Sequence, residues 1–465
     1  MITTTANSKN QNPNKKLQGP QEPIWYQTIW GLAKPVNYFD TMQKRYGDIF
    51  VKPQFAGLTS QVIISNPQAI QEIFTADVSL FKSGVGTQII QPIIGSNSLP
   101  SLDGDRHMNK RKLLMPPFHG ERMKAYEETI REITHKTTEK LTVGQKIIVR
   151  PLMQQISLNV ILRTIFGLKE GERYQQIKHG LVTMLNMFDN PLNAIFLFFK
   201  PLQRNFGMLT PWGNFLKQRE LLDKILYQEI SERRAKTEHT DKQDTGEDIL
   251  SLLLSARDEN DQPMTDVELR DELMTILFVG HESTANALTW ALYWIHYLPE
   301  VKEKLLQELN SIDIDHVDVM EIMALPYLNA VFSETLRIYP IIFFTSVRIL
   351  QAPMQLMGYD LPTGTLLAPC IYLTHQNPDI YPEPKKFKPE RFLERKFSPY
   401  EYLPFGAGNR RCLGYAFAMF EMKLALVTIL SNYSFSLAGE QHPLKPTRRG
   451  ITFTPSGGVC LTVNI

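Results

Sequence analysis

The sequence predicts a mainly α-helical protein with smaller β elements. Apolar residues recur at three- and four-residue spacing over most of residues 105–335, which is typical of packed helices. One helix begins at the capping box formed by Thr265 and Glu268 and continues to about Leu298, so it is about 33 residues, or roughly 50 Å, long. After Pro340, short apolar runs alternate with Pro and Gly, a texture typical of small sheets.

The first part of the chain mixes short elements with a long loop. Residues 1–22 are polar and predict a flexible lead-in to a single domain over residues 23–465. Residues 84–103 show no clear periodicity, so we expect a long ordered loop, a kind of segment that is often functional. The patterns predict helices over 39–46, 67–74, 327–339 and 415–430, strands over 49–52, 61–65, 366–368 and 370–373, and a terminal β element over 450–465.

The composition is that of an ordinary globular protein, with 43% of the 465 residues hydrophobic and 21% charged. A chain of this length can enclose a large organic cofactor. The net charge of +2 gives no whole-chain reason to expect nucleic acid as a partner. The N-terminus is polar and no stretch reaches the roughly 20 apolar residues of a spanning helix, so we expect a cytoplasmic protein without a transmembrane anchor.

The cysteines are few and scattered. Cys370, Cys412 and Cys460 form no Cys-x-x-Cys pair, which argues against a structural zinc site. A disulfide scaffold is also not expected from so few cysteines in so long a chain. A reducing cytoplasm is the simplest setting for this sequence.

Cys412 has the most informative surroundings. It directly precedes the helix predicted from Tyr415, where free backbone N–H groups and the helix dipole favour negative charge. Arg410 and Arg411 add positive charge beside it. Gly406, Gly408 and Gly414 allow tight turns and a close approach to a flat ligand. These features predict a stabilised thiolate.

A stabilised thiolate serves as a nucleophile or as a metal ligand. A phosphatase loop would need an arginine six residues after the cysteine, where this chain has Ala418. No nearby histidine in the sequence supplies a base for nucleophilic attack. An inert buried cysteine would not need the neighbouring glycines and arginines.

The run Phe405-x-x-Gly408-x-Arg410-x-Cys412-x-Gly414 resembles the haem-binding loop of the cytochrome P450 family. The resemblance implies that Cys412 is the axial ligand of the iron in haem b and that Arg410 binds a haem propionate. It also places Phe405, Gly406 and Gly414 against the cofactor. The similarity extends over most of the chain, with the family's motifs in their usual order, and it implies the cytochrome P450 fold with the long helix over the haem.

The middle of the long helix resembles the family's oxygen-activating segment. Glu282 and Ser283 fill the positions of the acid–alcohol pair that delivers protons to iron-bound oxygen. The chain departs from the pattern at Val279, where Ala or Gly is usual, and at Ser283, where Thr is usual. Serine keeps the hydroxyl but is less fixed in one rotamer. Glycine and hydroxyl residues in mid-helix also favour a local opening of the helix over the cofactor.

Other family motifs supply supporting residues. Glu334-x-x-Arg337 lies on a predicted helix with both side chains on one face. The resemblance groups this pair with Arg391 in a buried structural triad behind the haem. It also assigns His107, Arg111 and Arg348 to the haem propionates, through charge-assisted hydrogen bonds.

The resemblance also implies a substrate and partners. An apolar substrate is expected, because the segments at substrate-facing positions of the family carry few charges. The residues around Phe118–Arg122 resemble cyanobacterial members that oxidise long-chain fatty acids or terpenes. The substrate-facing segments are 88–94, 184–199, 278–279, 341–345 and 451–455, and within them we single out Ile89, Ile90, Phe278, Val279, Ile342, Phe343 and Phe453.

We expect a monomer that consumes O2 with electrons from a separate ferredoxin-type protein, which would dock on basic residues at the cysteine side of the haem: Lys110, Arg111, Lys112 and Arg411. Two alternatives remain open at this stage. One is a peroxide-using or rearranging haem-thiolate enzyme, against which the Glu282–Ser283 pair argues. The other is a haem-based sensor or electron carrier without enzymatic activity.

Overall fold

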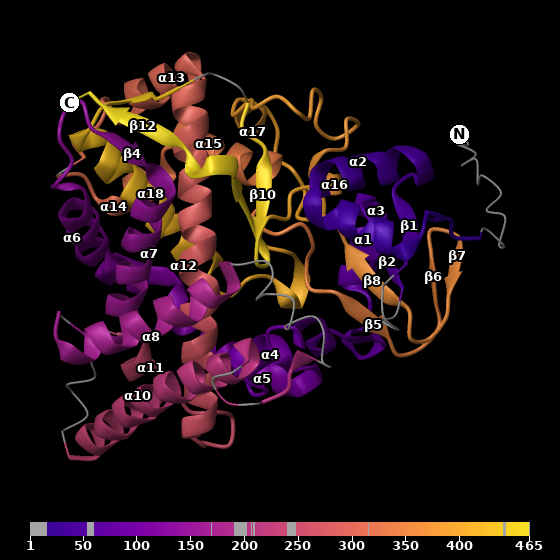
Figure 1. Ribbon diagram of the computed structural model, residues 1–465, viewed down its shortest axis with the longest axis horizontal. Coiled ribbons are helices and arrows are strands. Elements are labelled where there is room, and N and C mark those ends of the chain that lie inside the picture. The colour runs from indigo at the N-terminus through magenta and orange to yellow at the C-terminus, as the bar shows by residue number, and fades with distance from the viewer. Residues whose placement is uncertain are drawn as a thin grey trace, which may run out of the picture.

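The computed structural model describes residues 16–53, 60–168, 170–189, 202–205, 207, 210–239, 248–314, 316–439 and 443–464. Figure 1 shows a helix-rich part crossed by the long helix α12 (Asp266–Tyr297) and a smaller part that carries the largest sheet and the first helices. The first described residues lie in the smaller part, far from the last described residues (Figure 1). The mainly helical fold class predicted from the sequence is confirmed.

Helix α12 begins and ends where its sequence predicts. The Thr265 side chain accepts from the Glu268 backbone amide, and the Glu268 carboxylate accepts from the Thr265 amide, so both halves of the capping box are present. The helix has 32 residues and ends one residue before Leu298, which precedes Pro299. Most side chains of its second half are buried, as expected for a helix in the centre of the protein.

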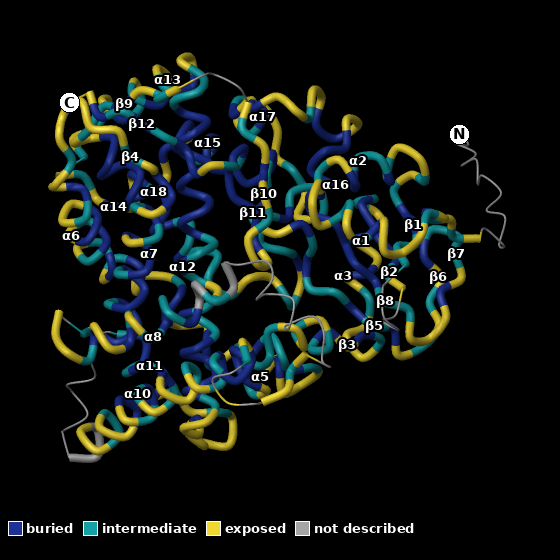
Figure 2. The backbone as a smooth tube through the Cα atoms, in the orientation of Figure 1, coloured by how far each residue is buried: buried dark blue, intermediate teal, exposed yellow. Residues whose placement is uncertain are grey.

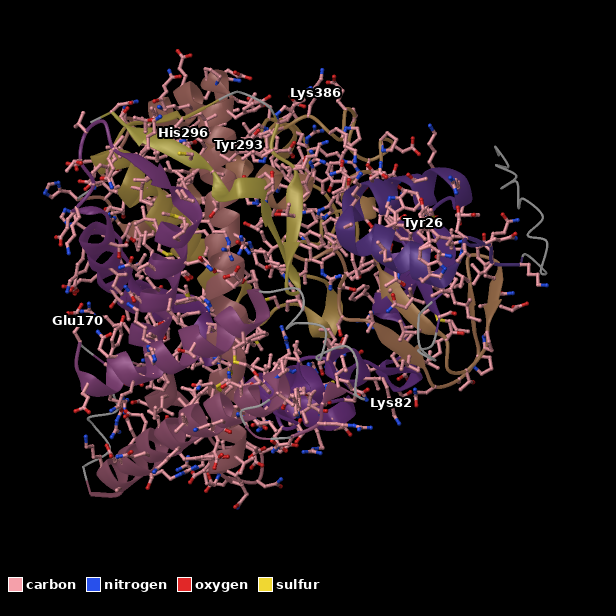
Figure 3. All side chains as sticks on the ribbon, in the orientation of Figure 1. Tyr26, Lys82, Glu170, Tyr293, His296 and Lys386 are labelled. Atoms are coloured by element: carbon pink, nitrogen blue, oxygen red, sulfur yellow. The ribbon has the colours of Figure 1, made fainter. Side chains whose placement is uncertain are left out.

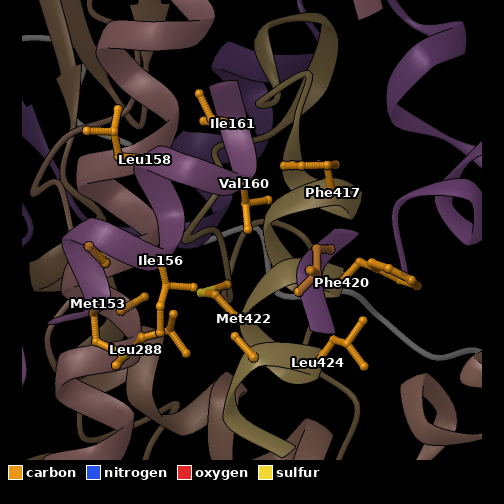
Figure 4. Packing of buried hydrophobic residues seen from close by; sticks show 14 of the residues in the cluster. Met153, Ile156, Leu158, Val160, Ile161, Leu288, Phe417, Phe420, Met422 and Leu424 are labelled. Atoms are coloured by element: carbon orange, nitrogen blue, oxygen red, sulfur yellow. The ribbon is translucent and has the colours of Figure 1, made fainter. Parts of the chain in front are cut away.

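The main core lies where α12 packs against α7 (Val149–Phe166) and α18 (Tyr415–Asn432). Figure 4 shows Met153 and Ile156 of α7, Leu288 of α12 and Met422 of α18 meeting in this core. Helices α6 (Glu127–Thr138) and α15 (Pro326–Ile338) complete it. Other described helices are α1 (Ile24–Ala33), α2 (Pro35–Tyr46), α3 (Pro67–Thr75), α4 (Gln91–Ile94), α5 (Gly104–Leu114), α8 (Glu172–Asp189), α10 (Pro211–His239), α11 (Ile249–Ser255), α13 (Pro299–Leu309), α14 (Val319–Ala324), α16 (Ile371–His375) and α17 (Arg391–Glu394).

The largest sheet has five strands in the order β1-β2-β8-β5-β3. Strands β2 and β8 are parallel, with Ile63 opposite Ala368, and the other neighbours are antiparallel. Smaller sheets have the orders β4-β12-β9, β10-β11 and β6-β7. The strands are β1 (Ile49–Lys52), β2 (Gln61–Ile64), β3 (Phe81–Lys82), β4 (Lys146–Ile148), β5 (Arg348–Leu350), β6 (Met354–Leu356), β7 (Tyr359–Leu361), β8 (Leu366–Pro369), β9 (Phe435–Leu437), β10 (Pro446–Arg449), β11 (Thr452–Pro455) and β12 (Cys460–Val463).

Two expectations about local structure are wrong. Residues 370–373, expected as a strand, belong mostly to the short helix α16, in which both the amide and the hydroxyl of Thr374 donate to the carbonyl of Cys370. Such short apolar runs suit a strand or a buried helix equally well. The expected loop over 84–103 contains the helix α4 and 3₁₀ turns at Gly84–Thr87 and Leu99–Ser101.

Burial follows the layering of the helices. Figure 2 shows that α12 is dark blue over most of its length, whereas parts of α10 and the outer loops are exposed. In the part of the chain that the structure describes, no helix is both long enough and apolar enough to cross a membrane.

Candidate functional site

The loop before α18 holds Cys412 in a fixed position. The Cys412 amide donates to the carbonyl of Phe405 at 2.8 Å, which closes the loop on itself. Gly406 and Gly408 have φ of 70° and 64°, a region in which only glycine is free of strain. A Cβ atom on Gly408 would lie 3.0 Å from the Phe74 ring and 3.3 Å from its carbonyl oxygen, so a side chain there would also crowd Phe74. Cys412 keeps accessible surface and forms no disulfide.

The electrostatics of Cys412 differ from the sequence-based prediction. The local stabilisers of a thiolate are present, because the Gly414 backbone amide and the charges of Arg111 and Arg411 all lower the pKa of the thiol. Desolvation by the surrounding protein is the larger effect, however, and the pKa of Cys412 is raised overall. For the protein without a cation bound to the sulfur, these stabilisers do not outweigh desolvation, so the stabilised thiolate stays a prediction for the haem-bound protein. A metal ion bound to the sulfur would supply the missing positive charge.

Buried cations gather beside the cysteine loop. The Arg348 guanidinium lies 3.8 Å above the Phe74 ring, and its Nη1 atom is buried without a hydrogen-bond partner among the described residues. Burial and the charge of Arg410 lower the pKa of Arg348 to about 10. Arg410 donates to the carbonyl of Leu102 at 2.5 Å and to the carboxylate of Asp103 at 2.6 Å. Asp103 therefore fixes Arg410 while Arg348 keeps a free donor.

His107 and Arg111 of α5 belong to the same cluster. His107 is 3% exposed, and burial together with the charges of Arg410 and Arg111 lowers its pKa to about 4. His107 is thus neutral at pH 7 and acts as a hydrogen-bonding group rather than a charge. Arg111 is half-buried and its charge acts on both Arg410 and Cys412. The structure therefore brings together the four residues that the sequence assigns to haem propionates.

Glu282 on α12 is the centre of a hydrogen-bond network. Its carboxylate accepts from Arg150 at 2.5 Å, from Gln154 at 2.7 Å and from Asn286 at 3.2 Å. Arg150 also donates to the Asn286 side chain, and Asn286 donates to the hydroxyl of Thr452 in β11. The acid is thus tied to α7 and to the C-terminal hairpin.

Ser283 lies on a regular turn of α12. Its hydroxyl donates to the carbonyls of Val279 and Gly280 at 2.9 and 3.2 Å. The expected local opening of the helix is absent, because α12 is continuous through this stretch. Packing, and not an opening of the helix, explains why residue 280 is glycine. A Cβ atom on Gly280 would lie 2.3 Å from the Ile161 side chain, so this glycine lets α7 approach α12 closely.

Glu334, Arg337 and Arg391 lie together in one buried cluster. Arg337 contacts Glu334 through two donors at 2.6 and 2.8 Å, and Arg391 contacts the same carboxylate at 3.1 Å. Arg337 also donates to the carbonyls of His375 and Pro384. The cluster connects α15 with the segment that leads to α17. All three side chains are buried.

The residues assigned to the substrate fall into two groups. Ile89, Val279 and Ile342 are 38 to 40% exposed, and Ile90 and Phe278 are half-buried. Phe343 and Phe453 are core residues instead, with ring centroids 3.8 Å apart. Of the predicted segment 184–199, residues 190–199 lie outside the described residues.

Several residues of the site had no recognisable signal in the sequence. Arg150 and Gln154 are 132 and 128 residues from Glu282, so no local spacing points to them. Of these residues, only Asp103 has a hint in the sequence, because an acidic residue next to the start of a helix often caps that helix. In this structure it instead accepts from the Ser83 and Gly84 amides and from Arg410.

Comparison with known proteins identifies the family of the chain. The cytochrome P450 family model matches residues 18–461. The putative cytochromes P450 135B1 and 135A1 of Mycobacterium tuberculosis are 34% and 31% identical to the chain. These alignments cover 92% and 95% of the chain and 88% and 94% of the relatives. The chain belongs to the cytochrome P450 family.

Solved structures agree as well. A retinoic acid-bound cyanobacterial CYP120A1 superposes with a TM-score of 0.79 and 26% identity, over 94% of this chain and 96% of that one. The haem domain of cytochrome P450DA has the same fold, with a TM-score of 0.79 and 22% identity over 96% of this chain and 97% of that one. The protein is thus a haem-thiolate monooxygenase that uses haem b, O2 and reducing equivalents from a redox partner.

The residues present fit haem b. Its propionates are carboxylates, and the buried Nη1 of Arg348 is a cationic donor that has no partner among the described residues. The iron takes a thiolate ligand, and Cys412 keeps accessible surface. A Cβ atom on Gly414 would meet nothing within 4 Å, so the backbone beside Cys412 is open for a flat ring.

Proposed function

We propose that the protein hydroxylates a long-chain fatty acid or a terpene with electrons from a separate ferredoxin-type donor. One oxygen atom of O2 enters a C–H bond, and the other leaves as water with two electrons and two protons. The observation that carries the proposal is that Cys412 keeps accessible surface in the same region as Arg348 and Arg410, whose side chains are buried. This arrangement suits an iron ligand next to two carboxylates.

The bound haem iron supplies the activation of O2. Cys412 binds the iron, and the negative charge of its thiolate offsets the positive charge of the metal. We assign Arg348, Arg410, His107 and Arg111 to the propionates, with Asp103 orienting Arg410. Phe405, Gly406 and Gly414 leave the loop flat enough for the ring to lie against it. Glu334, Arg337 and Arg391 hold the backbone of the region behind the loop.

Glu282 and Ser283 move the protons in this proposal. The Ser283 hydroxyl donates to the helix carbonyls, which leaves its oxygen able to accept a further hydrogen bond. Glu282 is partly exposed, so it can take up protons from water. Arg150, Gln154 and Asn286 hold its carboxylate in one place. They act as positioning residues.

Apolar side chains support the substrate class. Ile89, Val279 and Ile342 keep accessible surface and carry no charge, which favours an apolar ligand. Phe343 and Phe453 stack on each other in the core and act as fixed support rather than as a direct contact surface. The cyanobacterial relative is described as bound to retinoic acid, which is itself a terpenoid acid. This supports a terpene or a fatty acid of similar length.

One residue must be removed from the docking surface that the sequence predicts for an acidic electron donor. Lys110 is buried and paired with Glu268 at 2.5 Å, so it cannot contact a partner. Lys112 and Arg411 are exposed, and Arg411 lies 3.8 Å above the Tyr415 ring. We propose that these two residues with Arg111 receive the donor, and that the enzyme works as a monomer.

The test uses the haem-loaded protein with a ferredoxin, a ferredoxin reductase and reduced nicotinamide cofactor. Substrates are first selected from fatty acids and terpenes by the spectral shift that they induce. The expected result is a hydroxylated product that contains one atom from ¹⁸O2, and no product from Cys412→Ser. Product formed with peroxide but not with O2 would favour the peroxide-using alternative. Haem binding without product from any substrate would favour a sensor.

A further inference from the structure

Arg219 of α10 is a half-buried cation with an incomplete set of partners. Its Nε atom is buried and has no hydrogen-bond partner among the described residues. The same atom lies 3.5 Å from the Oδ2 atom of Asp223, which is close enough for an ion pair but does not form a hydrogen bond. Buried polar groups in folded proteins nearly always have partners, so an arginine in this state needs an explanation.

The acids near Arg219 already serve other donors. Arg270 donates to Asp223 at 2.6 Å and to Asp271 at 2.8 Å. The second oxygen of Asp271 accepts from the backbone and side-chain amides of Asn97 at 2.9 and 3.3 Å. Arg270 is 1% exposed, so it is the buried cation that these two carboxylates neutralise. Arg219 therefore keeps donors for another anion.

The charge of Arg219 is poorly compensated. Burial has the largest effect on its pKa and lowers it, and the charge of Arg270 lowers it further. The attraction of Asp223 and Asp271 acts in the opposite direction but does not restore the usual value. A desolvated cation beside a like charge is unfavourable unless an anion is bound to it. The side chain is 29% exposed, so a ligand can still reach it.

This cluster adjoins a segment of the proposed substrate region. Helices α10 and α4 both pack against α12, and Figure 3 shows the side chains of this region at the lower end of α12. Gly95 directly follows the predicted substrate-facing segment 88–94, and a Cβ atom there would lie 2.0 Å from the Asp271 carboxylate. That segment carries Ile89 and Ile90, which we assign to the substrate. The charged cluster thus lies next to apolar residues that suit the rest of a long ligand.

The separation between the cluster and the reaction site suits a long chain. Arg270 and Ser283 lie on the same helix, thirteen residues and therefore about 20 Å apart along its axis. An extended long-chain acid has a length of this order. Val279, which is apolar and 40% exposed, lies between them on α12. A carboxylate held beside Arg270 would therefore bring the far end of the chain, and not the carbons next to the carboxylate, near Ser283.

We propose that Arg219 binds the carboxylate of a long-chain acid and so determines which substrates the enzyme accepts and where it oxidises them. The inference rests on the proposed function and narrows it to substrates that carry a carboxylate at one end. A guanidinium and a carboxylate pair through two parallel N–H···O bonds, which a neutral ester cannot match in strength. The enzyme then prefers a free acid over an ester with the same chain.

The test measures dissociation constants of the haem-loaded protein from ligand-induced spectral shifts. The ligands are palmitic acid and abietic acid, a fatty acid and a terpenoid acid, each compared with its methyl ester. The wild type should bind at least one acid at least tenfold more tightly than its ester. Arg219→Met should lose this preference while its affinity for the ester stays unchanged. Lys224→Met, at an exposed position of the same helix, is the matched control and should keep the preference.

A second variant and the position of the product complete the test. Arg219→Lys keeps the charge but loses the planar fork, so its preference for the acid should be intermediate, and it decides the question if Arg219→Met does not fold. The wild type should hydroxylate palmitic acid near its methyl end, and hydroxylation next to the carboxylate would contradict the anchor.

The outcomes separate the anchor from the proposed function. Equal binding of acid and ester by the wild type, or an undiminished preference in the Arg219 variants, would overturn the anchor and leave the proposed function standing. If neither acid nor ester of either pair binds, the proposed substrate class is itself wrong, and the anchor falls with it.

Discussion

The carboxylate of Asp271 on α12 accepts a hydrogen bond of 2.9 Å from the backbone amide of Asn97, 174 residues earlier in the chain. The next residue, Glu272, accepts from the Leu99 amide at 2.8 Å. Gly95 makes this contact possible, because a Cβ atom there would lie 2.0 Å from the Asp271 carboxylate. Two carboxylates of the long helix thus hold the segment that follows α4.

Asp271→Asn should loosen this segment. Asn has one acceptor oxygen where Asp has two, so it cannot accept from both the Asn97 amide and the Arg270 guanidinium, and stability should fall by about 1 to 3 kcal/mol. Because Ile89 and Ile90 adjoin α4, we expect weaker substrate binding, with KM raised more than kcat is lowered. Spectral titration and steady-state kinetics measure this split. Asp266→Asn is the control, since its pair with Arg234 is on the surface. An unchanged KM in Asp271→Asn would contradict the prediction.

Glu272 should give the stability a specific pH dependence. Burial raises its pKa from 4.5 to about 8. Between these values the folded state binds more protons than the unfolded state, so this group makes the free energy of unfolding fall as the pH rises. Glu272→Gln cannot titrate and should flatten the fall between pH 5 and 8. Urea unfolding at several pH values measures how the free energy of unfolding changes with pH, and Glu128→Gln, at an exposed position, is the control. Parallel curves for wild type and Glu272→Gln would refute the effect.

Breaking the buried triad should be costly. Glu334→Gln leaves Arg337 and Arg391 buried without their shared anion, which typically costs about 3 to 5 kcal/mol. We expect a lower melting temperature and a lower haem-to-protein ratio in the purified variant. Lys136→Gln removes a surface pair with Glu170 and should change stability by less than about 1 kcal/mol. A triad variant as stable as this control would show that the cluster is dispensable.

Arg348 offers a test of haem retention. Arg348→Met removes the buried cationic donor but keeps the apolar stem over Phe74. Transfer of haem to apomyoglobin should become at least tenfold faster. Lys82→Met, on the neighbouring strand β3, is exposed and serves as the control. Equal transfer rates in the two variants would remove Arg348 from the propionate site.

The side chain at position 283 should control coupling of electrons to product. Ser283→Ala removes the hydroxyl and should lower product per electron consumed, with substrate binding unchanged. Ser283→Thr restores the usual family residue and fixes the hydroxyl rotamer, so coupling should be equal or higher. Oxygen uptake, peroxide release and product are measured together. Full coupling in Ser283→Ala would exclude a proton role for this residue.

Local patterns predicted the parts of the site that are local. The capping box at Thr265 and the position of Cys412 before α18 both follow from residues within a few positions of each other. Contacts between distant segments left no such pattern. The Arg150–Glu282 pair and the Asp271–Asn97 bond join residues more than a hundred positions apart. A single sequence carries no signal for them.

Other misjudgements came from competing local preferences. Gly280 and Ser283 are poor helix formers, yet α12 is regular there. The hydroxyl bonds back to the preceding turn, and the absence of a side chain at Gly280 improves packing against Ile161.

Because of the cation cluster, the amount of folded protein in a cell should depend on the supply of haem. Arg348, Arg410 and Arg111 are partly or fully buried, and desolvation lowers the pKa of each. Repulsion adds to this effect, from Arg410 on Arg348 and from Arg111 on Arg410. A dianionic ligand relieves this repulsion only in the folded state, so binding adds directly to stability. When haem is scarce, a larger fraction of newly made chains should unfold and be degraded. Cellular levels of this enzyme should therefore follow haem synthesis even when transcription is constant.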